Sequence, residues 1–241
     1  MSRFICGLQP VREAIRARGA DLEKVLVERG AGDDAQLDAL ARFATDHGVS
    51  VERVGRGDLD RLARGARHQG AVAFAPELHL VEIDDVLAKG DGALVVALDE
   101  LQDPQNFGAI VRSSVAMGAS AVMWPEHRSA PLSPAMFRAS AGAVEHATLC
   151  RVPSLTQALA VLKAGGMTVV GLDMQGADTI DRAELTGPVV LVIGAEGKGL
   201  RKPVKNACDR VVRLPMKGNI ASLNASVAAG IALYEVARQR A

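Results

Sequence analysis

The chain has 241 residues, 49% of them hydrophobic and 23% charged, so it can bury a substantial core as one large domain or two smaller ones. Basic and acidic residues balance at 28 each and aromatic residues make up only 3%, which argues against a globally basic polyanion binder and against base recognition on stacked rings. With three scattered cysteines, no CxxC pair and no long apolar run, we expect a cytoplasmic protein without a disulfide framework, a metal site or a membrane span.

Residues 1–75 alternate between short helices and short strands. Apolar periodicity predicts helices at 10–18 and 34–47 and strands at 25–28, 49–54 and 70–75. A polar stretch that begins with Pro76 follows, and we place a linker at residues 76–92. We expect residues 1–75 to form a separate small domain.

Arginine is concentrated towards the end of this first domain. The cluster consists of Arg53, Arg56, Arg61, Arg64 and Arg67, opposed only by Asp58 and Asp60. A second basic stretch, residues 196–241, carries nine lysines and arginines against three acidic residues. Such clusters are often solvated surface, but two of them on a neutral chain also suit a large polyanion that is bound locally.

From residue 93 the apolar runs become continuous, as in parallel strands that are buried on both faces. These runs span 93–98, 121–124, 168–172, 189–193 and 211–214. Helical periodicity lies between and after them, at 108–117, 134–144, 154–164 and 222–238. The alternation predicts an α/β domain over residues 93–241, with a mostly parallel sheet covered by helices.

Ligands of such sheets bind beyond the carboxyl ends of the strands, so the loops after residues 98, 193 and 214 form the candidate site. The first loop contains an Asp103-Pro104 turn and then Asn106, which can cap the following helix or serve a site. Arg112 lies six residues further along that helix, where a surface salt bridge is the alternative to a functional role.

The second loop has a GxxGxG spacing, at Gly194, Gly197 and Gly199. This spacing matches neither the dinucleotide GxGxxG pattern nor the nucleoside-triphosphate loop. Glycines there would let a ligand approach the backbone, and Glu196 among them is a carboxylate that a bare turn does not require. In the third loop Ser222 can cap a final helix of small residues, which permits close packing in the core or across a dimer interface.

Together the three segments resemble one known family. DPQNFGAIVRSS at 103–114, IGAEGKGL at 193–200 and LPMKGNIASLNASVAAGI at 214–231 are similar, in this order, to the three motifs of the SpoU family of RNA ribose 2′-O-methyltransferases, within the SPOUT class. FICGLQPVREAI near the N-terminus and HQGAVA at 68–73 resemble the leader domain of the bacterial enzyme that methylates a guanosine ribose of 23S rRNA. The resemblance covers essentially the whole chain.

This resemblance implies a fold, a cofactor and partners. Family members have a deep trefoil knot in a parallel-sheet domain, bind S-adenosylmethionine in the knot and act as homodimers. Their N-terminal α/β domain resembles an RNA-binding ribosomal protein. The implied function is S-adenosylmethionine-dependent 2′-O-methylation of a guanosine ribose in 23S rRNA. The alternatives are a tRNA or another rRNA site as substrate, or a non-catalytic RNA-binding factor in ribosome assembly.

The same resemblance assigns roles to residues of this chain. The implied catalytic set is Asn106, Arg112, Glu196, Ser222 and Asn224. The implied cofactor-binding set is Ile193, Gly194, Leu214, Met216, Ser222 and Leu223. From the arginine cluster, and not from the motifs, we expect Arg53, Arg56, Arg64 and Arg67 to bind RNA together with Arg112. Because a guanidinium is a poor proton acceptor, we expect Arg112 to grip an RNA phosphate whose oxygen receives the proton of the 2′-hydroxyl.

Overall fold

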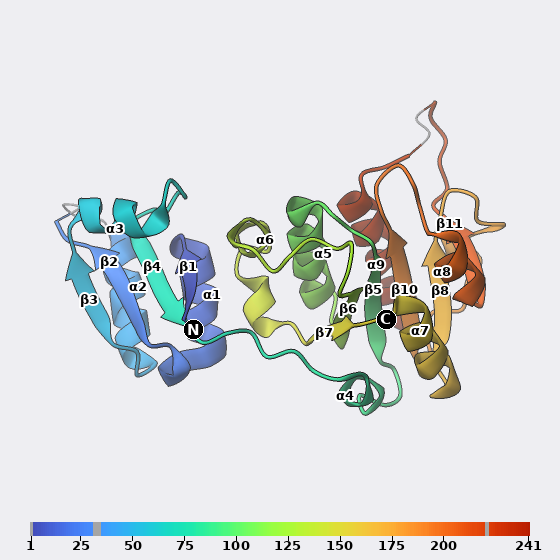
Figure 1. Cartoon of the computed structure of the whole chain (residues 1–241), viewed down its shortest axis with the longest axis horizontal. Helices are drawn as coiled ribbons and strands as arrows, with labels where there is room; N and C mark the ends of the chain where they lie inside the picture. Colours follow the sequence, from blue (N-terminus) through green and yellow to red (C-terminus); the bar gives the residue numbers. More distant parts are fainter. Residues whose placement is uncertain (1, 31–34, 220–221) are drawn as a thin grey trace. The chain divides into compact units, whose positions relative to one another are not determined.

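The computed structural model describes residues 2–30, 35–219 and 222–241, and the chain forms two compact units (Figure 1). The first unit contains Met1–His79 and Leu132–His146, and the second contains Leu80–Pro131 and Ala147–Ala241. Residue 34, where a predicted helix begins, and residues 220–221 of the third motif lie outside the described residues. Each unit has its own sheet.

The first unit is built on a four-stranded sheet in the order β1-β4-β2-β3. Its strands are β1 (Arg3–Cys6), β2 (Lys24–Glu28), β3 (Val51–Val54) and β4 (Ala71–Ala75). β4 is antiparallel to β1 and β2, whereas β2 and β3 are parallel. The helices are α1 (Leu8–Arg18), α2 (Ala35–Asp46), α3 (Arg56–Ala63) and α6 (Pro134–Ala139), with 3-10 turns at Gly19–Asp21 and Ala143–His146.

Two elements of this unit are not predicted by the sequence pattern. β1 has only four residues, too few for a clear alternation. α3 lies within the arginine cluster, whose charges hide the helical spacing of its two buried residues, Leu59 and Ala63. The other helices and strands of residues 1–75 agree with the prediction to within two residues at each described end.

The second unit is built on a seven-stranded sheet in the order β7-β6-β5-β10-β8-β11-β9, and all of its described pairings are parallel. The strands are β5 (Leu94–Asp99), β6 (Ala121–Pro125), β7 (Leu149–Val152), β8 (Thr168–Leu172), β9 (Asp178–Thr179), β10 (Val189–Gly194) and β11 (Arg210–Arg213). The predicted parallel α/β fold is confirmed. The two strands missed by the prediction, β7 and β9, are the short edge strands.

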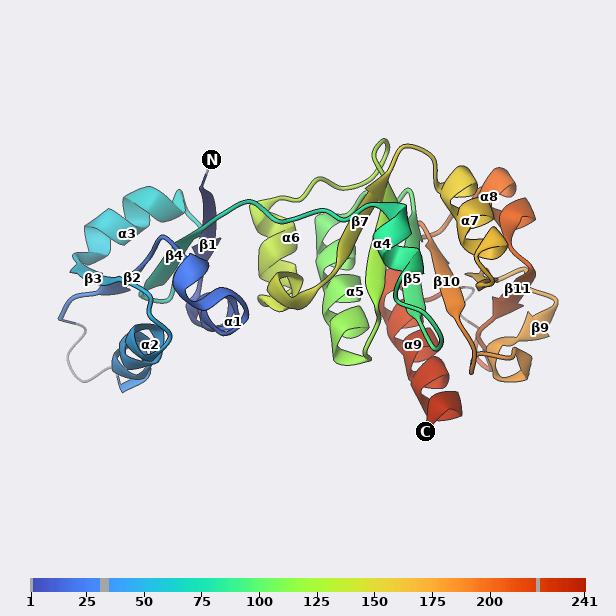
Figure 2. The same ribbon diagram turned by 90° about the horizontal axis from the view of Figure 1, so that it is seen from below.

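Helices cover both faces of this sheet, as Figure 2 shows. α4 (Ile83–Leu87), α7 (Leu155–Ala164) and α8 (Lys202–Ala207) pack on one face, where Val95, Ala97 and Val192 are buried. α5 (Pro104–Ala116) and α9 (Ala225–Arg240) lie side by side on the other face, and a 3-10 turn spans Ile180–Arg182. Among the described residues no helix has the length and hydropathy required to span a membrane.

α5 begins earlier than predicted, and this changes the position of Asn106. The helix starts at Pro104, and the Asp103 carboxylate caps it by accepting from the backbone N–H groups of Gln105 and Asn106, at 3.0 and 3.3 Å. Asn106 is therefore the third residue of the helix, and its interpretation as a cap is wrong. Its side-chain amide remains available for contacts beyond the helix.

α9 begins later than predicted. Its first residue is Ala225 and its cap is Asn224, whose Oδ1 accepts from the Ser226 N–H at 2.9 Å. The expectation that Ser222 caps this helix is therefore wrong, because Asn224 occupies the capping position. Ser222 instead lies in the loop that precedes the helix.

Candidate active site

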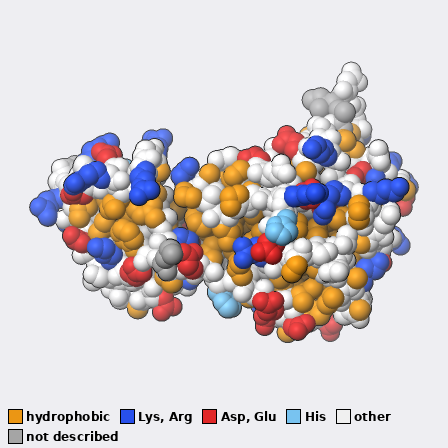
Figure 3. Space-filling model, in the orientation of Figure 1, with side chains coloured by type: hydrophobic (Ala, Val, Ile, Leu, Met, Phe, Trp, Pro, Cys, Tyr) orange, Lys and Arg blue, Asp and Glu red, His pale blue; other side chains and the backbone are white. Residues whose placement is uncertain are grey.

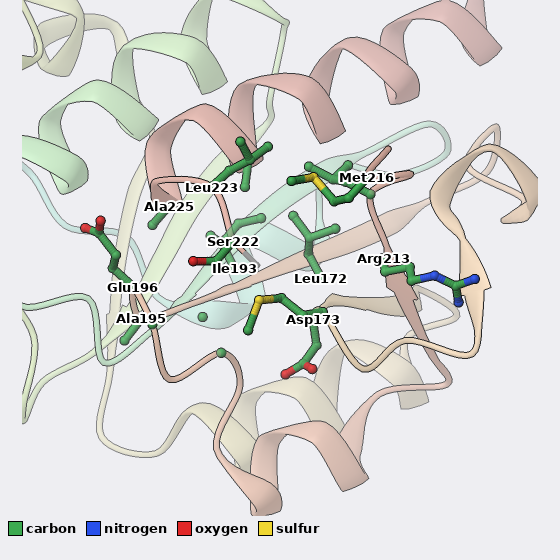
Figure 4. A pocket seen from close by; sticks show the side chains of 16 residues that line it. Leu172, Asp173, Ile193, Ala195, Glu196, Arg213, Met216, Ser222, Leu223 and Ala225 are labelled. Carbon is green, nitrogen blue, oxygen red and sulfur yellow. The ribbon is translucent and has the colours of Figure 1, made fainter. Parts of the chain in front are cut away.

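A cavity of about 260 Å³ opens at the carboxyl ends of β8, β10 and β11 (Figure 4). Its walls are mainly apolar, with two carboxylates and one guanidinium among them. The lining residues are Leu172, Asp173, Met174, Ile193, Gly194, Ala195, Glu196, Gly197, Gly199, Arg213, Leu214, Met216, Ser222, Leu223, Ala225 and Ala228. They include all six residues of the implied cofactor-binding set. Residues from the second and third motifs thus build one cavity.

The loop after β10, residues 195–201, turns back on itself beside the cavity. Ala195 and Gly199 form a bridge, in which the Gly199 N–H donates to the Ala195 carbonyl at 3.0 Å. A Cβ at Gly194 would lie closer than 3.0 Å to the backbone of Gly199 and Leu200, so a side chain does not fit there without a backbone shift. Gly199 has a φ of +64°, in the left-handed region that favours glycine. The glycines therefore determine the shape of the loop that carries Glu196.

Three polar side chains from three distant segments meet at this loop. Asn106 donates through Nδ2 to Glu196 Oε2 at 3.0 Å, and Asn224 donates through Nδ2 to Asn106 Oδ1 at 2.9 Å. Asn224 Nδ2 also lies 3.4 Å from the same Glu196 oxygen. Asn106 is only 4% exposed, and these bonds satisfy its buried amide. The structure thus brings Asn106, Glu196 and Asn224 together as one hydrogen-bonded cluster.

Asp173, which follows β8, also contacts the 195–201 loop. Its Oδ2 accepts from the Leu200 N–H at 3.1 Å, and its Oδ1 accepts from the Gln175 N–H at 2.9 Å and from Lys205 Nζ at 3.1 Å. Burial by itself raises the pKa of this carboxyl, but the hydrogen bonds outweigh it and hold the pKa of Asp173 below its usual value. The three motifs do not point to Asp173. A carboxylate directly after a buried strand is the signal that could have found it.

The remaining predicted site residues lie outside the cavity. Arg112 is on α5, is exposed, and has no ion pair or hydrogen-bond partner within the described part of the chain. Arg53, Arg56, Arg64 and Arg67 belong to the first unit and are all exposed. Figure 3 shows Lys and Arg side chains along the edge of that unit where α3 lies. Arg53 and Arg56 also lie within ion-pair distance of carboxylates, at 2.5 and 3.9 Å.

Two known families match this chain. Residues 93–234 match the SpoU rRNA methylase family, which is more than half of the chain. The chain belongs to the SpoU rRNA methylase family. Residues 4–81 match a second family, described as RNA 2′-O ribose methyltransferase substrate binding. The resemblance inferred from the three motifs is therefore confirmed, and the second match covers the segment that resembled a leader domain.

Relatives in the SpoU family align with nearly the whole chain. A protein of Mycolicibacterium vanbaalenii, named an uncharacterized tRNA/rRNA methyltransferase, is 44% identical over 243 residues, which cover 99% of this chain and 77% of the relative. A protein of Mycobacterium leprae with a similar name is 41% identical over 98% of this chain and 77% of its own length. These names give the reaction as methyl transfer to tRNA or rRNA, and they do not say which of the two RNAs is the substrate.

Solved structures of the family share this fold. AviRb from Streptomyces viridochromogenes, a SpoU methyltransferase in complex with AdoMet, has a TM-score of 0.79 and 27% identity, over 99% of this chain and 90% of its own. An AdoMet-bound rRNA methyltransferase from Sinorhizobium meliloti has a TM-score of 0.80 and 26% identity, over 98% of this chain and 87% of its own. The TrmH/SpoU tRNA modifying enzyme of A. aeolicus has a TM-score of 0.57 and 30% identity, over 66% of this chain and 80% of its own.

Proposed function

We propose that this SpoU family member transfers a methyl group from S-adenosylmethionine to a ribose 2′-hydroxyl of RNA. The observation that carries the proposal is the hydrogen-bonded cluster of Asn106, Glu196 and Asn224 beside an apolar cavity. Groups that can orient a hydroxyl thus adjoin a cavity whose apolar walls suit the adenine ring of a nucleoside cofactor. AdoMet in solved structures of the family supports this choice of methyl donor.

The residues of the cavity fit S-adenosylmethionine. Leu172 and Leu223 offer apolar walls for an adenine ring, and the carboxylate of Glu196 favours a cation such as a sulfonium. The 195–201 loop, which forms part of the cavity wall, can pass this close to Gly194 only because Gly194 has no side chain. We assign the binding of the cofactor to Ile193, Gly194, Leu214, Met216, Ser222 and Leu223. When bound, S-adenosylmethionine supplies an electrophilic methyl group.

The polar residues act on the ribose. A 2′-hydroxyl is a weak nucleophile until it loses its proton, and the reacting atoms must be held about 3–3.5 Å apart and in line. Asn106 and Asn224 orient the ribose, while Glu196 fixes both amides by accepting their hydrogen bonds. Ser222 adds a hydroxyl to the lining of the cofactor cavity, which Glu196 also borders. Arg112, exposed on α5, holds the RNA phosphate whose oxygen takes the proton.

Arg112→Lys tests this role of the guanidinium. The lysine keeps the positive charge but loses the planar fork that binds a phosphate through two hydrogen bonds. We expect kcat to fall roughly 10- to 100-fold, because hydrogen bonds to charged groups contribute about 1.5–3 kcal/mol. Arg151→Lys, at an exposed position on β7, is the matched control. Near-full turnover of Arg112→Lys in a tritiated methyl-transfer assay would contradict the role.

Within the RNAs, we propose 23S rRNA as the substrate and a guanosine as the modified nucleotide. Structures named as SpoU or rRNA methyltransferases align over 98–99% of this chain. The tRNA modifying enzyme aligns over only 66%. The substrate-binding match at residues 4–81 and the exposed arginines of the first unit support RNA docking there.

A methyl-transfer assay with three reactions separates the substrates. The purified protein receives tritiated S-adenosylmethionine with unmodified 23S rRNA, with unmodified tRNA, or with no RNA. We expect labelling of 23S rRNA alone. Labelling of tRNA would assign the other substrate class. If no reaction gave labelling although the protein still bound RNA, the protein would be a non-catalytic RNA-binding factor and not an enzyme.

The proposed enzyme is a cytoplasmic homodimer with a knotted second unit. An apolar stripe on α9 supports the dimer, because Val227, Ile231 and Tyr234 are spaced along one face of the helix and are 50%, 43% and 58% exposed. The match to the SpoU rRNA methylase family supports the knot.

Ile231→Glu tests the dimer. A carboxylate at the centre of the α9 stripe would have to be desolvated at the interface. We expect the dimer dissociation constant to rise roughly 30-fold or more, measured by light scattering on a concentration series. Val161→Glu on α7, where the valine is 42% exposed, is the control for an exposed apolar residue elsewhere. A monomeric parent protein, or an Ile231→Glu dimer of unchanged stability, would contradict this interface.

A further inference from the structure

A second cavity adjoins the proposed cofactor cavity, and the assignments above do not use it. It has a volume of about 270 Å³ and shares Ala195, Glu196 and Gly199 with the first. Asn106 lines this second cavity and not the first. Because Glu196 borders both spaces, a ligand in the second cavity reaches the same polar cluster as a ligand in the first.

The acidic groups at the back of this second cavity are already paired within the chain. Asp99 is 1% exposed and accepts from the backbone N–H and the Nε of Arg201, at 2.8 and 2.7 Å. Glu100 also pairs with Arg201, at 2.8 Å, and Asp103 caps α5. These pairs fix the shape of the cavity, and they leave no demand for a cation there.

Two other residues that line the second cavity have side chains that are not paired in this way. Gln102 and Lys198 line the second cavity and are exposed. Neither side chain has a hydrogen-bond or ion-pair partner among residues 2–30, 35–219 and 222–241. Gln102 can donate and accept at once, as the edge of a nucleobase requires, and Lys198 offers a positive charge to a phosphate.

We infer that the second cavity receives the target nucleoside, with Gln102 contacting the edge of its base and Lys198 an adjoining phosphate. The inference rests on the proposed function, because the proposed RNA substrate supplies a base, a ribose and a phosphate at one place. The ribose would lie at Asn106 and Glu196, which border this cavity. Gln102 is then a specificity-determining residue, and Lys198 contributes affinity independent of sequence.

The test uses Gln102→Ala and Lys198→Ala in the full chain, with S-adenosylmethionine binding measured by calorimetry and RNA methylation measured as a function of salt. Gln102→Ala should lower kcat/KM for RNA about tenfold or more. Lys198→Ala should raise KM and reduce the slope of log KM against log salt by about 0.7–1. Both variants should bind S-adenosylmethionine as the parent does. Gln105→Ala and Lys202→Ala, exposed neighbours that line neither cavity, should behave as the parent.

The outcomes separate this inference from the function on which it rests. Parent-like kcat/KM for Gln102→Ala, or an unchanged salt slope for Lys198→Ala, would overturn the assignment of that residue while methylation by the parent upholds the proposed function. Equal losses in the two control variants would also overturn it, since the effect would then not belong to the cavity. A parent protein that methylates no RNA would overturn the proposed function itself.

Discussion

Gly194→Ala is expected to weaken S-adenosylmethionine binding roughly 5- to 150-fold, because overpacking a close contact costs about 1–3 kcal/mol. The added methyl group would meet the backbone of Gly199 and Leu200, not the movable end of a side chain. The 195–201 loop would have to shift, and with it Glu196 and the wall of the cavity. Methyl transfer should fall with the binding. Calorimetric titration with S-adenosylmethionine measures the effect.

The matched control for this substitution is Gly187→Ala. Gly187 lies outside the cavity, has no positive φ and has no atom within 4 Å of an added Cβ. We expect its cofactor affinity to equal that of the parent. If Gly194→Ala bound S-adenosylmethionine as tightly as Gly187→Ala, the 195–201 loop would not form part of the cofactor site. Thermal unfolding of both variants establishes that each is folded.

Asn106→Ala is expected to lower kcat about 100-fold while the dissociation constant for S-adenosylmethionine changes little. Asn106 stands between the other two members of the cluster, donating to Glu196 and accepting from Asn224. Its loss frees both to move, and misplacement of a reacting group by about 1 Å can cost about 100-fold in rate. Cofactor binding should persist because Asn106 does not line the first cavity.

Single-turnover methylation with saturating cofactor measures this separation of chemistry from binding. Gln105→Ala, one residue earlier on α5 and exposed, is the control and should retain parent kinetics. A kcat for Asn106→Ala within a few-fold of the parent value would show that the cluster does not position the ribose. An equal loss of cofactor affinity and of kcat would assign Asn106 to the cofactor instead.

The elements predicted best are those whose apolar run is continuous. The run at 168–172 coincides with β8, and the run at 189–193 is one residue shorter than β10. Full burial on both faces of a parallel sheet produces such runs, so their signal is local. β9 and α8 were missed because they have two and six residues and few buried side chains. Short elements depend on their neighbours more than on their own periodicity.

The alternation of strands and helices along the sequence predicts which three loops form the candidate site. It does not predict the hydrogen bonds between residues of these loops. The loops after β5, β10 and β11 are candidates because ligands bind beyond the carboxyl ends of the strands in parallel sheets. The bond from Asn106 to Glu196 joins residues 90 positions apart, so no local pattern reports it. Asp173 and Arg201 were missed for the same reason. Each is defined by the distant backbone or carboxylate that it contacts, Leu200 for Asp173 and Asp99 for Arg201.

The most direct measurement of the central claim is the position of the methyl group in the RNA product. Methylated 23S rRNA is digested to nucleosides and analysed by mass spectrometry against an unmethylated control. The arrangement of cofactor cavity and polar cluster predicts one added methyl group on a ribose 2′ oxygen, and its absence from the Asn106→Ala product at matched time. The proposed substrate places this methyl group in a guanosine. A methyl group on a base, or an RNA that gains none, would contradict it.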